Sequence, residues 1–110
     1  MYDAAQLLHI LGFLYGSHGQ AKRGAAYLLI AAQLSPANPG LLRTLAHLLT
    51  LDGQADKALA TIAHLERLDG REEPGLLLLK SRALSAAGRR AEARRTFQDF
   101  LAQRGSRQHV

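Results

Sequence analysis

Three turns of similar sequence recur at a nearly constant interval, and this repetition restricts the fold more than any other feature. Gly19, Gly53 and Gly88 stand 34 and 35 residues apart, and each begins a similar segment: "GQAKRGAAYLLIA", "GQADKALATIAHL" and "GRRAEARRTFQDF". A small residue follows each glycine after five positions, and a large apolar residue follows after nine. Self-similarity at a fixed period is typical of stacked structural units, so the chain is predicted to build one unit three times.

Each unit is predicted to be a pair of α-helices. Leucine and alanine, which favour helices, dominate the chain, whereas β-branched residues are few and the single valine is the last residue. A glycine in each turn takes a left-handed conformation at little cost, and a small residue on each helix allows a close crossing. Helices are expected near residues 3–16, 20–34, 39–51, 54–68, 74–87 and 89–103. The residues expected at the crossings are Gly12, Gly24, Ala46, Ala58 and Ala93.

Two helix boundaries carry clear local signals. Asn38 is a good N-cap residue, and Pro39 is a good first helical residue because its missing N–H would have no partner there. Pro74 repeats that role, with Glu72 and Glu73 near the positive end of the helix dipole. The prolines and glycines therefore serve helix boundaries and turns, not catalysis.

The period and its small residues resemble the tetratricopeptide repeat. The first unit matches the family pattern at Leu8, Leu11, Gly12, Tyr15, Leu28, Ala31 and Pro36, and the second at Leu42, Leu45, Ala46, Leu49, Ala58 and Ile62. In the third unit Lys80 and Ser81 replace an apolar and a small residue, so Gly88, Ala93 and Phe97 identify it. The resemblance implies an all-α fold of three tandem tetratricopeptide-like helix-turn-helix repeats in a short right-handed superhelix. The repeats are expected at about 5–38, 39–73 and 74–105, within a single domain at 1–104 followed by a flexible tail at 105–110.

The composition argues against catalysis, metal binding and membrane insertion. The absence of cysteine removes disulfides and thiolate ligands, and the five histidines show no spacing such as HExxH. His9 and His47 both lie in the expected first helices of their units, but further ligands have no evident source. The first segment has Asp3 in place of a basic region, and Gln6 interrupts its apolar run, so neither a signal peptide nor a membrane span is expected. We therefore expect a cytoplasmic protein that is not an enzyme and holds no metal or cofactor.

In tetratricopeptide proteins the first helix of each pair lines a concave face. By register, the residues expected in this partner-binding groove are Gln6, His9, Phe13, Arg43, His47, Leu51, Leu78, Arg82 and Ser85. This set could hold an extended or helical peptide, with Arg43 and Arg82 reaching acidic groups or carbonyls. The alternative is that Phe13, Leu51 and Leu78 complete the core of a small domain.

The end of the chain combines exposed apolar residues with a basic charge. Residues 1–79 contain six Lys or Arg and seven Asp or Glu, whereas residues 80–110 contain eight and two. This segment could meet nucleic acid, an acidic membrane or an acidic protein surface, or it could be the solvated face of the last helix. Terminal repeats normally need a polar cap, so Phe97, Phe100 and Leu101 are expected to be only partly covered and to meet a protein partner. Leu7, Ile10 and Leu14 raise the same expectation at the other end.

The order of elements also resembles the small tetratricopeptide chaperones of bacterial type III secretion systems, above all the YscY (SctY) type. The likeness rests on "LGFLYGSHGQAKRGAAYLL", "NPGLLRTLAHLLTLDGQADKA" and "LLLLKSRALSAAGRRAEARRTFQDFLAQR", which cover nearly the whole chain. It implies a cytoplasmic bacterial chaperone involved in virulence. Such a chaperone would form a heterodimer with a small secreted protein of the YscX (SctX) type and dock with it on an export gate of the SctV type.

Other functions stay open at this point. A needle-subunit chaperone of the YscG type has a similar size, and translocator chaperones of the SycD type have the same repeats but are expected to be longer. A scaffold unrelated to secretion is a further class. A nucleic-acid binder that uses the basic last helix is another, but no nucleic-acid partner is expected, because the few aromatic residues count against stacking on single strands.

Overall fold

The computed structural model describes residues 3–69 and 74–108, and within these ranges it is all-helical, as predicted. The helices of the described part are α1 (Ala4–Ser17), α2 (Ala21–Leu34), α3 (Pro39–Leu51), α4 (Ala55–Asp69), α5 (Pro74–Ala86) and α6 (Arg90–Gln108). Every bound but the last lies within one residue of its expected position. Glu72 and Glu73, expected to favour the start of the fifth helix, lie outside the described residues.

The last helix is longer than expected. It continues to Gln108, so residues 105–108, which were expected in a flexible tail, are helical. Gly105 is not among the described glycines with positive φ, and a glycine with helical dihedrals does not end a helix. Good helix formers precede it, among them Ala102 and Gln103, and no proline follows. Residues 109 and 110 lie outside the described part.

The turns at the three repeated glycines have the same geometry. Gly19, Gly53 and Gly88 adopt φ values of 79°, 78° and 80°. In each turn the amide of the following residue, Gln20, Gln54 or Arg89, donates to the carbonyl five residues earlier, with N···O distances of 2.9, 2.8 and 2.9 Å. The glycine amide itself donates to the carbonyl three residues earlier. This pair of bonds closes the preceding helix and requires a left-handed residue, which explains why glycine recurs there.

Gly53→Ala is expected to lower the free energy of unfolding by about 1–2 kcal/mol, because the left-handed conformation brings a Cβ atom too close to the following carbonyl oxygen. Urea denaturation followed by circular dichroism measures this change. Gly75→Ala is the matched control, since Gly75 has no positive φ and an added Cβ atom would meet nothing there. Equal stability of the two variants would contradict this account of the turn.

The first hairpin is held by direct contact between backbones. Gly12 and Gly24 are buried at the crossing of α1 and α2, and a Cβ atom added at Gly24 would lie 2.6 Å from the carbonyl oxygen of Gly12. The side chain of Leu48, on α3, lies against both Gly16 and Gly24. α3 therefore packs into a cradle between α1 and α2 that only small residues can form.

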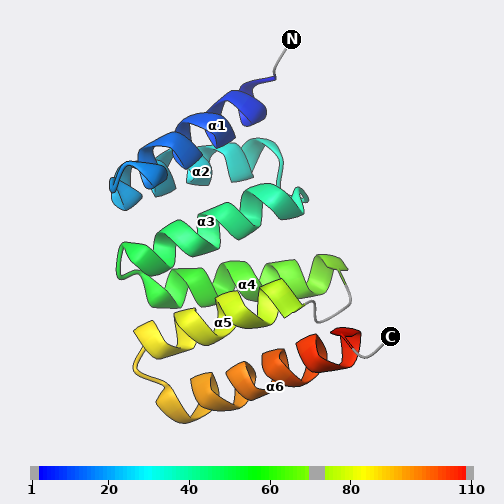
Figure 1. Cartoon of the computed structure of the whole chain (residues 1–110). Helices are drawn as coiled ribbons and strands as arrows, with labels where there is room; N and C mark the ends of the chain where they lie inside the picture. The colour runs from blue at the N-terminus through cyan, green and yellow to red at the C-terminus, as the bar shows by residue number, and fades with distance from the viewer. Residues whose placement is uncertain (1–2, 70–73, 109–110) are drawn as a thin grey trace.

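The hairpins stack in chain order, so that the two ends of the chain lie at opposite ends of the molecule (Figure 1). α3 contacts α1 and α2 of the first hairpin, and α5 contacts α3 and α4 of the second. The core lies along these contacts, with Leu28, Leu41, Leu49, Ile62 and Leu65 almost completely buried. The start of α3 follows the expected signal, because the amide of Leu41 donates to Asn38 Oδ1 at 3.2 Å. Within the described ranges, no helix is long and apolar enough to cross a membrane.

Candidate functional site

Several residues predicted to form a groove meet in two open pockets. The first, which we call the α1–α3 pocket, has a volume of about 310 Å³. It is lined by Phe13, Gly16, Ser17, Arg43, Thr44, His47 and Leu48. Of the predicted set, Phe13, Arg43 and His47 therefore lie together. The pocket combines an aromatic ring with groups that can donate hydrogen bonds, which is the mixture that a peptide ligand needs.

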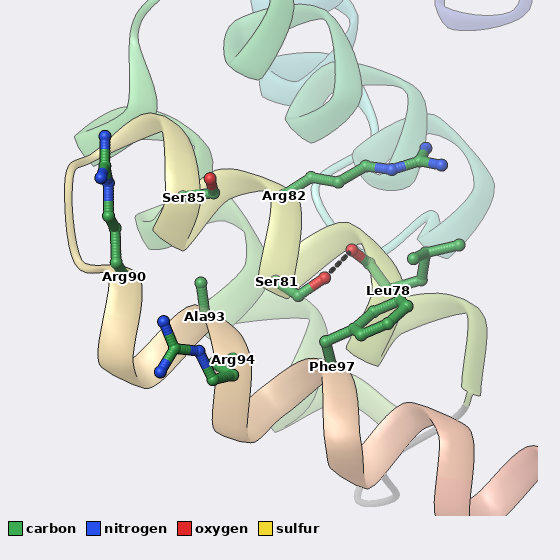
Figure 2. Close-up of a pocket in the computed structure, with 8 residues that line it drawn as sticks. All are labelled: Leu78, Ser81, Arg82, Ser85, Arg90, Ala93, Arg94 and Phe97. Atoms are coloured by element: carbon green, nitrogen blue, oxygen red, sulfur yellow. Dashed lines mark hydrogen bonds between the residues drawn. The ribbon is translucent and has the colours of Figure 1, made fainter.

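The second pocket, which we call the α5–α6 pocket, has a volume of about 590 Å³ and lies in the last hairpin (Figure 2). It is lined by Leu78, Ser81, Arg82 and Ser85 of α5 and by Arg90, Ala93, Arg94 and Phe97 of α6. It brings together the predicted residues Leu78, Arg82 and Ser85. Ser81, where the repeat pattern has a small residue, is buried, and its hydroxyl donates to the carbonyl of Leu78 at 2.8 Å.

Two apolar residues of the predicted groove are surface residues. The side chain of Phe13 is 58% exposed and that of Leu51 is 60% exposed, so neither completes the core. Leu51 lines neither pocket, whereas Phe13 borders the α1–α3 pocket. Leu78 is half-buried. Helical periodicity placed these three residues on one face, but their side chains differ in how far they are buried.

Gln6 and His9 are engaged in local contacts. The Gln6 side chain accepts a hydrogen bond from the amide of Asp3 at 3.0 Å, and the amide of Gln6 donates to the carboxylate of Asp3 at 2.8 Å. These bonds form a capping box at the start of α1, for which the Asp-x-x-Gln spacing was an available signal. His9 Nε2 lies 3.1 Å from the hydroxyl oxygen of Thr44. Because that hydroxyl donates its single hydrogen to the carbonyl of Gly40, the imidazole must be the donor in its contact with Thr44.

The apolar end of α6 is partly exposed. Phe97 is 42% exposed and Leu101 is 49% exposed, while Phe100 is half-buried with its ring centroid 5.7 Å from that of Phe97. At the other end of the stack, Leu7, Ile10 and Leu14 of α1 are also exposed. Three further apolar residues are exposed on α2 and were not predicted to be so: Leu29, Ile30 and Leu34.

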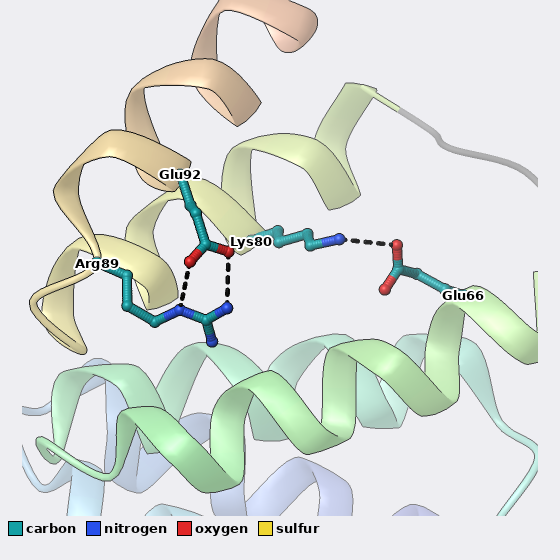
Figure 3. Close-up of polar contacts among 4 residues, drawn as sticks. All are labelled: Glu66, Lys80, Arg89 and Glu92. Atoms are coloured by element: carbon teal, nitrogen blue, oxygen red, sulfur yellow. Dashed lines mark hydrogen bonds and ion pairs between the residues drawn. The ribbon is translucent and has the colours of Figure 1, made fainter.

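Two charged contacts involve residues of the last hairpin (Figure 3). Lys80, which departs from the repeat pattern, reaches from α5 to Glu66 of α4, with Nζ and Oε2 3.1 Å apart. Arg89 donates two hydrogen bonds to the carboxylate of Glu92, at 2.9 and 2.6 Å. These hydrogen bonds lower the pKa of Glu92 and raise the pKa of Arg89. Where the repeat pattern has an apolar residue, Lys80 thus forms an ion pair between neighbouring hairpins.

Comparison with known proteins identifies a solved structure with a similar fold. No protein-family model and no curated protein sequence matches the chain. Among solved structures, the chain is similar to the crystal structure of the type III secretion translocator chaperone SycD of Yersinia enterocolitica, determined as an alternative dimer. The match has a TM-score of 0.76 at 20% sequence identity and covers 93% of this chain and 79% of the other. The two chains therefore share a fold, and the expected tetratricopeptide-like all-helical architecture is confirmed at that level.

Proposed function

We propose that this chain is a chaperone of a type III secretion system, which binds a secreted protein in the cytoplasm and keeps its apolar segments covered. The observation that carries the proposal is the structural similarity to SycD, a translocator chaperone, over 93% of the chain. The sequence resemblance to the small chaperones of the same systems supports it from separate observations. The α1–α3 pocket supplies a place where a polypeptide would bind.

The binding mechanism follows from the stacked hairpins. In this proposal they are three tetratricopeptide repeats in a right-handed superhelix, with α1, α3 and α5 on the concave face. An apolar side chain of the partner packs against Phe13, and Arg43 and His47 donate hydrogen bonds to its carbonyls or carboxylates. The exposed ring of Phe13 loses contact with water when the partner binds, which stabilises the complex.

Two partners are candidates, each favoured by a different observation. Structural similarity to SycD favours a translocator protein of the secretion system. The closing segment "ARRTFQDFL" favours the YscY type, whose partner is a small secreted protein of the YscX type that docks with its chaperone on an export gate of the SctV type. With either partner, the complex is a heterodimer of this chain and a secreted protein.

Copurification from the native cell tests the proposal, and mass spectrometry identifies the partner. We expect a secreted protein to be recovered with the chain, and Phe13→Glu and Arg43→Glu each to weaken its binding about tenfold or more, since few interface residues carry most of the binding energy. Arg67→Glu is the matched control, because Arg67 is an exposed arginine of α4 that lines neither pocket. Circular dichroism confirms that each variant remains folded.

The outcomes separate the candidates. A translocator or a YscX-type protein among the recovered chains selects one of the two partners, and a needle subunit would point to the YscG type. Recovery of nucleic acid, with binding that weakens steeply as salt rises, would overturn the proposal. Partner binding that survives both pocket substitutions would leave a chaperone with its site elsewhere, so the α1–α3 pocket would be the wrong assignment.

A further inference from the structure

The α5–α6 pocket occupies the place where a next hairpin would pack. In the first hairpin, Leu48 of α3 lies against Gly16 and Gly24. The residues at the same repeat positions in the last hairpin are Ser85 and Ala93, which both line the α5–α6 pocket (Figure 2). The cradle that receives α3 in the first hairpin is therefore present again in the last one, and no helix of the described chain fills it.

Burial at an equivalent position supports this comparison. Leu28, Ile62 and Phe97 follow their turn glycines by the same number of residues. Leu28 and Ile62 are 0% and 1% exposed, because the next hairpin covers them, whereas Phe97 is 42% exposed. The last hairpin thus presents an apolar surface that the same fold covers in its other two units.

The charge of the pocket distinguishes it from the cradles that are filled. Arg90 stands where the earlier hairpins have alanine, and Arg94 stands where they have Ala25 and Leu59. Ala25 is buried and Leu59 packs against the core, but Arg90 and Arg94 are exposed at the pocket. Arg82 of α5 also lines the pocket, with its side chain directed away from these two arginines (Figure 2). None of these three arginines forms an ion pair with a carboxylate of the described ranges.

We propose that the α5–α6 pocket binds an acidic amphipathic helix of a partner protein. An aliphatic side chain of that helix lies between Ser85 and Ala93, as Leu48 lies between Gly16 and Gly24, and its carboxylates pair with Arg90 and Arg94. Guanidinium groups form charge-assisted hydrogen bonds with carboxylates in fixed geometry, so they select an acidic helix over a neutral or basic one. This surface is separate from the α1–α3 pocket, and the inference does not depend on which protein binds there.

The charge of the chain's own helices argues against a second copy as the occupant. The helices that begin the hairpins, α1, α3 and α5, contain no Asp or Glu within their bounds. α3 carries Arg43, and α5 carries Lys80 and Arg82, so each would bring positive charge to a pocket that is already basic. A partner helix with glutamates beside its leucines complements the pocket where these helices do not.

A pair of synthetic peptides tests the proposal. Each is a stapled helix of about four turns with leucines on one face, flanked by glutamates in one peptide and by lysines in the other. We expect the glutamate peptide to bind the full chain at least about tenfold more tightly than the lysine peptide in fluorescence anisotropy, and the double change Arg90→Glu with Arg94→Glu to reverse this preference. Ser85→Leu, which fills the cradle without changing the charge, is expected to weaken binding of the glutamate peptide about tenfold.

The controls separate this pocket from general charge attraction and from the other pocket. Arg95→Glu with Arg104→Glu makes the same charge change at exposed positions of α6 that do not line the pocket, and it should leave the preference unchanged. Equal effects of the two double substitutions, or full binding by the Ser85→Leu variant, would overturn the proposal. So would loss of peptide binding in Phe13→Glu, which would place the peptide in the α1–α3 pocket. Circular dichroism confirms that every variant is folded.

Discussion

Leu48→Ala is expected to lower the free energy of unfolding by about 2–5 kcal/mol, which is the usual cost of replacing a buried leucine with alanine. The side chain of Leu48 is 3% exposed and lies in the cradle formed by Gly16 and Gly24. Its removal leaves a cavity between the first two hairpins, and the rigid helix backbones around it close only in part. Urea denaturation followed by circular dichroism measures the loss.

A matched control and a second substitution make this prediction specific. Leu51→Ala removes the same atoms from an exposed position of the same helix, and it should change stability by less than about 0.5 kcal/mol. In the Leu48→Ala background, Gly16→Ala should stabilise the chain, because the atoms nearest to a Cβ atom at Gly16 all belong to the Leu48 side chain. Independent effects of the two substitutions would show that Leu48 does not occupy the cradle.

Gly24→Ala is expected to lower the free energy of unfolding by about 1–3 kcal/mol through overpacking. An added Cβ atom would lie 2.6 Å from the carbonyl oxygen of Gly12, and this backbone atom can move only if α1 moves away from α2. Alanine has a higher helix propensity than glycine by about 1 kcal/mol, and this gain opposes the cost of the clash. The measured loss of stability is therefore the cost of the clash minus this gain. Thermal and urea denaturation both measure it.

Gly40→Ala is the control for this second prediction. Gly40 is also helical, but an added Cβ atom would make only an ordinary contact of 3.6 Å with Asn38 Oδ1. Leu48→Ala should not rescue Gly24→Ala in full, because the clash with the Gly12 backbone remains. A stabilised Gly24→Ala variant would mean that α1 and α2 separate without cost, which the close crossing does not allow.

The helices were predictable because their boundaries depend on local chemistry. The left-handed glycines of the turns, and Asn38 with Pro39 before α3, act through the few residues around them. The end of α6 was not predictable in the same way, because Gly105 ends a helix only if it adopts a left-handed conformation. Sequence alone does not say which conformation such a glycine takes.

The surface of the hairpins was harder to predict, because it depends on distances between helices. Helical periodicity placed Phe13 and Leu51 on one face but could not say whether a neighbouring helix covers them, and both are exposed. The basic charge of the last segment left several interpretations open, and the meeting of Arg90 and Arg94 with α5 in a pocket became clear only with both helices in place. One signal was available in the sequence: when the repeats are aligned, Arg90 stands at a position where the first two repeats have alanine.

The stacking of hairpins in chain order also determines how the molecule can deform. Within the described residues, the first and last hairpins touch the middle one but not each other. Opening of a terminal hairpin therefore breaks one interface and leaves the other intact, whereas the middle hairpin cannot open without breaking both. Small tilts at these two seams would add along the stack, so the scaffold can adjust its bend to ligands of different shape without repacking the interior of any hairpin.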